Sequence, residues 1–239
     1  MTEIFALHLM DENAFEQLRE QLLEKLPDAV KVKITAFARP ADAQRSLAGE
    51  LATRYLLASR FGKKLPNQPF TTGEKGKPFP DGFENIHFNI SHSGKWVAIA
   101  FSDTAVGVDV EKIRRVPEGV ANRFFSQPEK DWINSCPDET SKADVFFTLW
   151  TLKESFLKAI GKGLTKNLNS FTVSPIADGN FLLENDPEAH GYSLKNFQFE
   201  EGYKLSACSY GDLFDASVTI LDLHEIINAH NNLKKDFLH

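Results

Sequence analysis

The sequence lacks the long hydrophobic runs and the cysteine pairs that mark several large classes of protein. No stretch of the chain approaches the roughly 18 uninterrupted apolar residues that a membrane-spanning helix needs. Residues 1–10 also lack the basic start and the small-residue cleavage pattern of an export signal. The only two cysteines, Cys136 and Cys208, form no CxxC pair. We therefore expect a cytoplasmic protein with no membrane association, no disulfide framework and no zinc site, in which both cysteines are small buried residues.

Several motifs of common enzyme classes are missing as well. The glycines of segment 73–78 are too close together for a phosphate-binding P-loop, and a proline stands where that motif needs Ser or Thr. The glycines of segment 161–163 are followed by no third glycine at the dinucleotide spacing. Ser91 and His92 are adjacent, but no G-x-S-x-G motif surrounds them. The sequence therefore gives no support to a P-loop kinase, a Rossmann enzyme or a Ser-His hydrolase.

The charge of the chain is acidic overall but unevenly placed. With 42% hydrophobic and 25% charged residues the chain should fold, and its net charge of −6 argues against a nucleic-acid partner. Residues 30–80 hold ten basic and three acidic side chains, so this segment carries +7 and the rest of the chain −13. A solvated basic helix face explains part of this excess, namely Arg54, Arg60, Lys63 and Lys64. A polyphosphate ligand is the competing explanation for Lys31, Lys33, Arg39, Arg45 and Lys77.

The hydrophobic pattern predicts a mixture of helices and strands. Apolar residues at three- and four-residue spacing predict helices over 42–61 and 146–160, each ended by a glycine. Strands are predicted over 87–90, 96–101, 106–111, 171–175, 181–183, 192–199, 203–208 and 216–221. We expect a turn at 91–94, short helices and loops over 117–132, and a polar C-terminal stretch from 225 to 239 that frays.

One internal similarity suggests a duplication. Both predicted helices close on a similar sequence, Phe-Gly-Lys-Lys-Leu at 61–65 and Ile-Gly-Lys-Gly-Leu at 160–164, and a Phe-Thr pair follows each. The offset of about 100 residues predicts two related α+β halves, residues 1–106 and 107–239. Chance similarity between two helix ends is the alternative.

Two carboxylates alternate with valines in the strand predicted over 106–111. Val108 and Val110 should point into a core, which places Asp109 and Glu111 together on the other, solvent-facing side. Two neighbouring anions repel each other unless a cation lies between them, and a hard divalent ion, Mg²⁺ first, prefers such oxygen ligands. An ordinary solvated strand face is the alternative.

The second helix offers a third carboxylate. Glu154 and Lys158 are four residues apart and lie on one side of the helix, where by themselves they form an ordinary surface ion pair. If that side lies beside Asp109 and Glu111, Glu154 can act as a third oxygen ligand and Lys158 as a phosphate clamp. The spacing alone does not establish that proximity.

Five motifs, taken in order, resemble those of the surfactin-type 4′-phosphopantetheinyl transferases. They are Gly76-Lys-Pro78, residues 88–94, Gly107-Val-Asp-Val-Glu111, Arg123-Phe-Phe125 and residues 150–164, and residues 43–46 resemble the family's upstream segment. The resemblance implies an α+β fold of two similar halves related by a pseudo-twofold axis. It also implies transfer of the 4′-phosphopantetheine group from coenzyme A to a serine of an acyl, peptidyl or aryl carrier protein, with Mg²⁺ required and 3′,5′-ADP released.

The same resemblance implies roles for particular residues. It assigns the magnesium ligands to Asp109, Glu111 and Glu154, in the half 107–239. Glu154 is then the candidate base, directly or through a metal-bound water, and Lys158 contacts the pyrophosphate. Coenzyme A falls to the half 1–106, with His92 near the 3′-phosphate; the implied contacts are Lys33, Arg39, Arg45, Ser46, Lys77, Ser91 and His92. Ser46 stands where the family has a threonine, a change that keeps the hydroxyl group.

The segment that follows the strand predicted over 106–111 is expected to dock the carrier protein. We expect a monomer whose carrier partner docks on residues 112–132, through Val116, Val120, Phe124, Phe125 and Trp132 and the basic Arg114, Arg115 and Arg123. At least two of the three aromatic residues should instead belong to the core.

One alternative function is a metal-dependent pyrophosphohydrolase of coenzyme A or nucleotides. The other is a non-catalytic carrier-protein binder, which should have lost one of the three acids. The sequence does not indicate which carrier proteins or which pathway, siderophore, antibiotic or lipid synthesis, the enzyme serves.

Overall fold

The computed structural model describes residues 1–61, 70–72, 78–79, 85–116, 119–211, 214–215 and 217–235. The chain forms two compact units. The larger unit comprises Met1–Ile4, Thr71–Gly94 and Ala98–Val218, and the smaller unit comprises Phe5–Phe70, Lys95–Val97 and Thr219–His239. Both units contain helices and strands, so the predicted α+β class is confirmed. The division into halves 1–106 and 107–239 stays a prediction.

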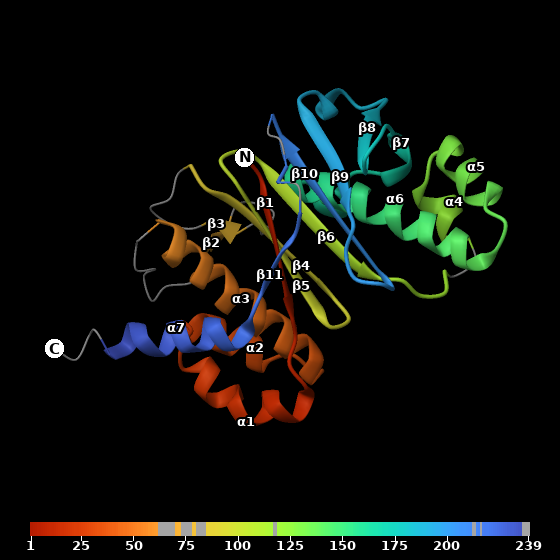
Figure 1. The fold of residues 1–239 in the computed structure, drawn as a ribbon. Helices are drawn as coiled ribbons and strands as arrows, with labels where there is room; N and C mark the ends of the chain where they lie inside the picture. The colour runs from red at the N-terminus through yellow and green to blue at the C-terminus, as the bar shows by residue number, and fades with distance from the viewer. Residues whose placement is uncertain are drawn as a thin grey trace. The chain divides into compact units, whose positions relative to one another are not determined.

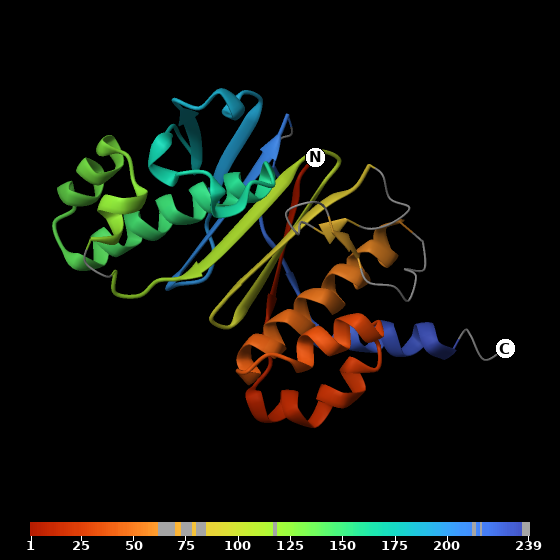
Figure 2. The same cartoon turned by 180° about the vertical axis from the view of Figure 1, so that it is seen from behind.

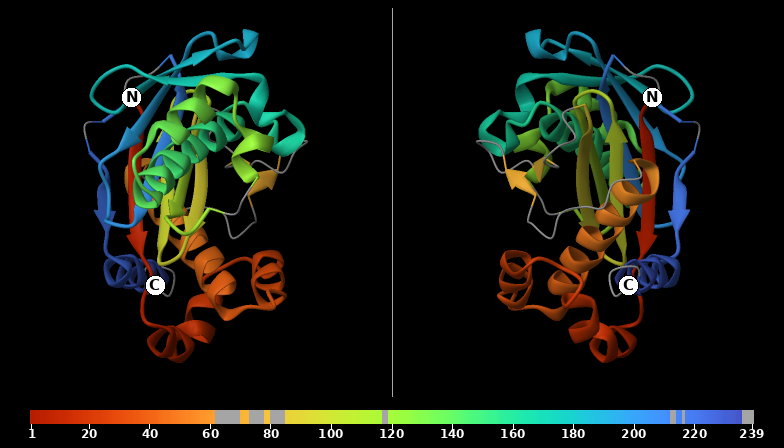
Figure 3. Two further views of the ribbon diagram at one scale, coloured as in Figure 1. Left: turned by 90° about the vertical axis from the view of Figure 1, so that its right-hand side faces the viewer. Right: turned by 90° about the vertical axis from the view of Figure 1, so that its left-hand side faces the viewer.

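The larger unit is built on a five-stranded antiparallel sheet in the order β6-β10-β9-β8-β7. Its strands are β6 (Val106–Lys112), β7 (Thr172–Pro175), β8 (Asn180–Glu184), β9 (Tyr192–Phe197) and β10 (Tyr203–Tyr210). The long helix α6 (Glu139–Ala159) packs along one face of this sheet, against β6, β10, β9 and β7 (Figures 1 and 2). Two shorter helices, α4 (Val120–Phe124) and α5 (Gln127–Ser135), precede α6, and α5 packs against it (Figure 3).

Helix α6 begins earlier than the apolar pattern predicts. The side chain of Asp138 accepts a hydrogen bond from the Ser141 amide and caps the helix, which extends it back from residue 146 to Glu139. Its end is as predicted, because Gly161 adopts a φ of +67° and the Lys162 amide bonds back to the Leu157 carbonyl.

The smaller unit contains four helices around a short parallel strand pair. Its helices are α1 (Glu12–Leu23), α2 (Asp28–Thr35), α3 (Pro40–Phe61) and α7 (Leu223–Lys235), and α3 packs against the other three. Strand β1 (Glu3–His8) pairs with β11 (Thr219–Leu221) in parallel. The strand order of this sheet is β11-β1-β5-β4, of which β4 (His87–Ser93) and most of β5 (Trp96–Ser102) belong to the larger unit. The pair β2 (Thr71–Thr72) and β3 (Pro78–Phe79) belongs to the larger unit.

Two sequence expectations are wrong. The turn predicted at 91–94 is confined to Gly94 and Lys95, because β4 continues through Ser93 and Gly94 supplies the positive φ of +56° that a tight turn needs. The stretch expected to fray, 225–239, is helical up to Lys235 as part of α7. That helix is held by a buried apolar face of Leu223, Ile226 and Ile227.

Within the described ranges, no helix is both long and apolar enough to cross a membrane. Both cysteines are free; Cys208 is buried, as predicted, but Cys136 is only half-buried, so the expectation is wrong for that residue. The predicted site residues Asp109, Glu111 and Glu154 lie in the larger unit, where β4 and α6 both pack against β6.

Candidate active site

Strand β6 lies at the edge of the five-stranded sheet, and three backbone amides along its outer edge donate hydrogen bonds to side chains instead of to a neighbouring strand. Polar side chains at alternate positions of β4, those of Asn89, Ser91 and Ser93, accept hydrogen bonds from backbone amides of β6. The amides are those of Val108, Val110 and Lys112, at 2.9, 3.3 and 3.1 Å respectively. These side chains replace a neighbouring strand's carbonyl groups, so they align β4 with β6 residue by residue.

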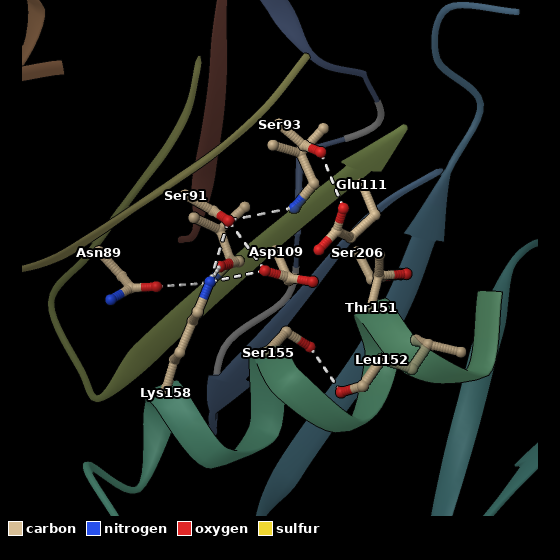
Figure 4. A network of polar contacts seen from close by, with 12 residues as sticks. Asn89, Ser91, Ser93, Asp109, Glu111, Thr151, Leu152, Ser155, Lys158 and Ser206 are labelled. Carbon is tan, nitrogen blue, oxygen red and sulfur yellow. Dashed lines mark hydrogen bonds and ion pairs between the residues drawn. The ribbon is translucent and has the colours of Figure 1, made fainter. Parts of the chain in front are cut away.

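The two serines also hold the two carboxylates of β6. Ser91 donates its hydroxyl hydrogen to Asp109 Oδ1 at 2.8 Å, and Ser93 donates to Glu111 Oε2 at 2.7 Å (Figure 4). The sequence pattern predicted a strand over 87–90 and a turn over 91–94, and neither Asn89 nor Ser93 was predicted as a site residue. Their alternation with apolar or exposed residues is the signal that could have revealed a strand with one polar face.

Lys158 reaches the same carboxylate from helix α6. Its Nζ lies 2.6 Å from Asp109 Oδ1, 2.9 Å from Ser91 Oγ and 3.1 Å from the Val108 carbonyl oxygen (Figure 4). The ammonium group therefore supplies a positive charge directly beside Asp109. The structure thus brings together the strand and the helix whose proximity the sequence left open.

Gly107 allows this close approach. A Cβ at this position would lie 2.1 Å from the Ser155 carbonyl oxygen and 2.5 Å from the Ala159 amide nitrogen, both of which are backbone atoms of α6. Real Cβ atoms do not come so near, so only glycine lets β6 and α6 pack at this distance. Because side chains alternate along a strand, Asp109 and Glu111 share the face of Gly107 and point toward α6.

The predicted solvent-facing position of the carboxylates is therefore wrong for Asp109. Its side chain is buried, with only 5% of the residue exposed, while Glu111 is half-buried. Val108 and Val110 are buried in the core, as predicted. The sequence pattern distinguishes the two faces of β6, but it does not show that α6 covers the polar one.

Burial and mutual repulsion change the acidity of these groups. The pKa of Glu154 is raised to about 7, first by burial and then by the negative charge of Asp109, with Lys158 opposing the shift. Burial also raises the pKa of Glu111, although the hydrogen bond from Ser93 opposes it. Glu154 is therefore poised to gain or lose a proton near neutral pH.

Two buried carboxylate oxygens, Asp109 Oδ2 and Glu154 Oε1, have no hydrogen-bond partner among the described residues. Both face a region that also holds the Glu111 carboxylate, and oxygen ligands of this kind suit a hard divalent cation. As the side chains lie, the described residues contain no closed group of three or more metal-ligating side chains. The Lys158 ammonium group contacts Oδ1 of Asp109, which leaves Oδ2 as the oxygen that could bind a metal ion.

The three acids open onto one cavity of about 510 Å³. Its remaining lining is Arg123, Phe124, Trp150, Lys166, Asn167 and Leu168. Phe124 and Trp150 pack edge to face, with ring centroids 5.3 Å apart. The cavity therefore combines an acidic floor, an apolar wall and two basic side chains, which suits a ligand with both phosphate and apolar parts.

Comparison with known proteins covers nearly the whole chain. A model for the N-terminal part of 4′-phosphopantetheinyl transferases matches residues 14–104, and a model for the 4′-phosphopantetheinyl transferase superfamily matches residues 105–208. The chain is 32% identical to the 4′-phosphopantetheinyl transferase Sfp of Bacillus subtilis (strain 168), over 91% of this chain and 97% of that protein. The chain belongs to the 4′-phosphopantetheinyl transferase family.

Two further relatives extend the similarity. The 4′-phosphopantetheinyl transferase psf-1 of Bacillus pumilus is 32% identical over 97% of this chain and all of that protein. The 4′-phosphopantetheinyl transferase gsp of Aneurinibacillus migulanus is 38% identical over 83% of this chain and 84% of that protein. The resemblance drawn from the five motifs is thus confirmed, and the chain is an enzyme of this transferase family.

The other predicted site residues of the transferase are placed as follows. His92 is exposed on β4 and, one residue from the buried Ser91, points to the opposite face of the strand. The predicted phosphate contacts of the smaller unit are on or next to α2 and α3: Lys33 and Arg39 are exposed, and Arg45 and Ser46 are half-buried. Arg45 forms an ion pair with Asp42. Lys77 lies outside the described residues.

The raised pKa of Glu154 predicts how the metal-free transferase responds to pH. The folded state holds this proton more tightly than the unfolded chain does, so the free energy of unfolding should fall as pH rises from about 4.5 to about 7 and level off above that. Urea unfolding in the presence of a chelator measures this directly. Glu154→Gln should remove most of the fall, and an identical pH dependence in the two proteins would show that Glu154 is not perturbed.

Proposed function

We propose that the transferase moves 4′-phosphopantetheine from coenzyme A to a serine of an apo carrier protein and releases 3′,5′-ADP. The observation that carries this proposal is the grouping of Asp109, Glu111 and Glu154 on the 510 Å³ cavity, with the Lys158 ammonium group bonded to Asp109. Carboxylates with a lysine beside them suit a reaction in which a pyrophosphate is held and one of its phosphorus–oxygen bonds is broken.

A divalent cation, Mg²⁺, would be held by Asp109, Glu111 and Glu154. The unpartnered oxygens of Asp109 and Glu154 support this ligand set. When bound, the cation would neutralise the charge of the pyrophosphate. Ser91 and Ser93 keep two of the carboxylates oriented by donating hydrogen bonds to their other oxygens.

Glu154 is the candidate base for the carrier serine. Without a cation, burial and Asp109 raise its pKa to about 7; a bound cation would lower that pKa, and the ionised carboxylate is the form that would accept the serine proton. The serine oxygen then bonds to the phosphorus attached to pantetheine, the bond from that phosphorus to the bridging oxygen breaks, and 3′,5′-ADP leaves with that oxygen. Lys158, whose side chain is 26% exposed, would leave Asp109 to contact the leaving phosphate. No covalent enzyme intermediate is needed, so positioning and charge would provide most of the rate.

The nucleotide part of coenzyme A is assigned to the basic residues Lys33, Arg39, Arg45 and Lys77, with Ser46 and His92. The +7 charge of residues 30–80 supports this assignment, because coenzyme A carries a pyrophosphate and a 3′-phosphate. Ser91 is less available than these residues for a contact with coenzyme A. Its hydroxyl already donates to Asp109 and accepts from Lys158 and the Val110 amide, so a bond to coenzyme A would replace one of these.

His92 provides a test of donor binding. If it contacts the 3′-phosphate, His92→Ala should raise the KM for coenzyme A about tenfold and leave the KM for 3′-dephospho-coenzyme A nearly unchanged. His190, which is also exposed in the larger unit, serves as the control in His190→Ala. Equal losses with both donors would show that His92 does not recognise that phosphate.

A second cavity, of about 450 Å³, supports carrier docking on the predicted segment 112–132. Its apolar lining is Ile113, Val116, Ala121, Ile133, Ala143 and Phe146, and the basic Arg114, Arg115 and Lys142 stand with them. This combination suits an acidic helix that buries an apolar side chain. Phe125 belongs to the core, whereas Val120, Phe124 and Trp132 are partly buried like Val116 but do not line this cavity.

Arg115 is the cleanest probe of this docking surface, because it is exposed and lines the cavity. Arg115→Glu should raise the KM for the carrier protein about tenfold, since it sets a negative charge against an acidic partner, and leave the KM for coenzyme A unchanged. Lys195→Glu makes the same charge change on β9 as a control. Unaltered carrier kinetics in Arg115→Glu would place docking elsewhere.

The product 3′,5′-ADP separates the proposed function from its alternatives. A pyrophosphohydrolase would release it from coenzyme A without any carrier protein, and a non-catalytic binder would release none. The presence of all three acids argues against the binder. We expect release only when coenzyme A, Mg²⁺ and an apo carrier protein are all present, from a monomer working in the cytoplasm.

A further inference from the structure

Lys153, the residue before Glu154, is a charged side chain in the core of the larger unit. It has no exposed surface, and its Nζ is surrounded by three acceptors. The acceptors are the Leu168 carbonyl oxygen at 2.7 Å, the Phe171 carbonyl oxygen at 2.6 Å and Glu129 Oε1 at 2.9 Å. An ammonium group has three hydrogens to donate, so the side chain is fully satisfied and does not face the cavity itself.

The partner of Lys153 extends these contacts to a second segment. Glu129, on α5, is 1% exposed. Its Oε1 also accepts from the Val173 amide at 2.8 Å, and its Oε2 accepts from the Ser126 amide at 2.8 Å, where it closes the capping box of α5. Lys153 and Glu129 together therefore fix the start of α5, the start of β7 and the chain around Leu168.

The segments fixed in this way form two walls of the 510 Å³ cavity. Arg123 and Phe124 of one wall directly precede the capped start of α5, and the other wall is the run 166–168. Neither wall lies on a long element, because α4 has five residues and the 3₁₀ turn at Leu168–Ser170 has three. Such short elements have little stability of their own and depend on tertiary contacts.

We propose that Lys153 is a positioning residue for phosphopantetheinyl transfer, holding both walls of the cavity at a fixed distance from Glu154. The proposal rests on the proposed function of that cavity. A buried ion pair is an expensive way to stabilise a core, and apolar residues of similar volume often do as well or better. Its specific bonds to the Leu168 carbonyl and, through Glu129, to the Ser126 amide give the pair a geometric role that apolar residues could not fill.

The test compares the double variant Lys153→Met/Glu129→Gln with the wild-type enzyme. Methionine fills similar space, and glutamine keeps an acceptor for one of the two amides, so neither buried charge is left unpaired. Hydrogen exchange without substrate should become faster in residues 119–126 and 163–171. With substrates, kcat should fall between about tenfold and a hundredfold, because misplacement of about 1 Å is enough for such a loss.

Thr151→Val is the matched control. Thr151 is buried on the same helix and its hydroxyl contacts Ser206 Oγ at 2.7 Å, so the substitution removes a buried polar contact that does not reach the cavity walls. A merely structural role for Lys153 would lower the melting temperature of both variants and leave kcat per folded molecule unchanged. That result, with exchange of the two wall segments unchanged, would overturn the proposal.

Glu129→Gln alone covers the case in which the double variant does not fold. It keeps the ammonium group and should show faster exchange in the same two segments with a smaller loss of kcat; wild-type exchange and kcat would overturn the proposal. If the wild-type enzyme modifies no carrier protein, the proposed function fails. Unchanged exchange in the walls would then overturn the positioning role independently, because that measurement needs no substrate.

Discussion

Asp109→Asn is expected to reduce transfer between about a hundredfold and a thousandfold while the protein remains folded. Asparagine keeps the shape and the acceptor oxygen for Ser91, but it removes the negative charge that faces Lys158 and the unpartnered oxygen Oδ2. Alanine is a poorer probe because the side chain is buried, and its removal would leave Ser91 and Lys158 facing an empty space.

The control for this substitution is Asp144→Asn. Asp144 pairs with Lys204 near the surface of the same unit, so it tests the loss of an ion pair away from the cavity. We expect near-normal transfer in Asp144→Asn and strongly reduced transfer in Asp109→Asn, with circular dichroism confirming that both variants are folded. Normal turnover by Asp109→Asn at ordinary magnesium concentration would remove Asp109 from the ligand set.

Gly107→Ala is expected to affect both stability and activity. The added Cβ would meet backbone atoms of α6 at 2.1 and 2.5 Å, so α6 and β6 would have to move apart. We expect the free energy of unfolding to fall by about 3 kcal/mol. Transfer should fall about a hundredfold in the molecules that stay folded, because the movement separates Glu154 from Asp109.

Ser155→Ala provides the comparison for Gly107→Ala. Ser155 contributes its backbone carbonyl to the contact with Gly107, which the substitution keeps, and its buried hydroxyl donates to the Leu152 carbonyl within α6. Chemical denaturation and steady-state kinetics should show a much smaller change than for Gly107→Ala. If Gly107→Ala is as stable and active as Ser155→Ala, the close packing of β6 on α6 is not needed.

The sequence predicted the elements of the site better than their surroundings. The alternation at 106–111 and the helical spacing at 146–160 placed Asp109, Glu111 and Glu154 on the correct elements. Burial of Asp109 was not predictable, because it depends on which helix covers the polar face of β6 at Gly107. The predicted strand ended at residue 90, three residues before β4 ends, because Ser91 and Ser93 are typical turn residues. In the structure their hydroxyl groups accept hydrogen bonds from backbone amides of β6.

The helical spacing predicts that Lys153 is buried but does not predict its partners. It falls on the apolar side of the predicted helix with Phe156 and Leu157, which signals a buried charge. Its partners, Glu129 and the carbonyl groups of Leu168 and Phe171, lie at least 15 residues away and meet it only in the folded chain. Spacing within one helix cannot identify such partners.

Mass spectrometry of a panel of apo carrier domains, incubated with coenzyme A and Mg²⁺, tests the central claim most directly. The account predicts a phosphopantetheine adduct on the carrier serine with the wild-type enzyme, lost when a chelator is added and lost in Asp109→Asn. Unmodified carrier domains together with release of 3′,5′-ADP would contradict it, and so would an adduct formed equally well by Asp109→Asn.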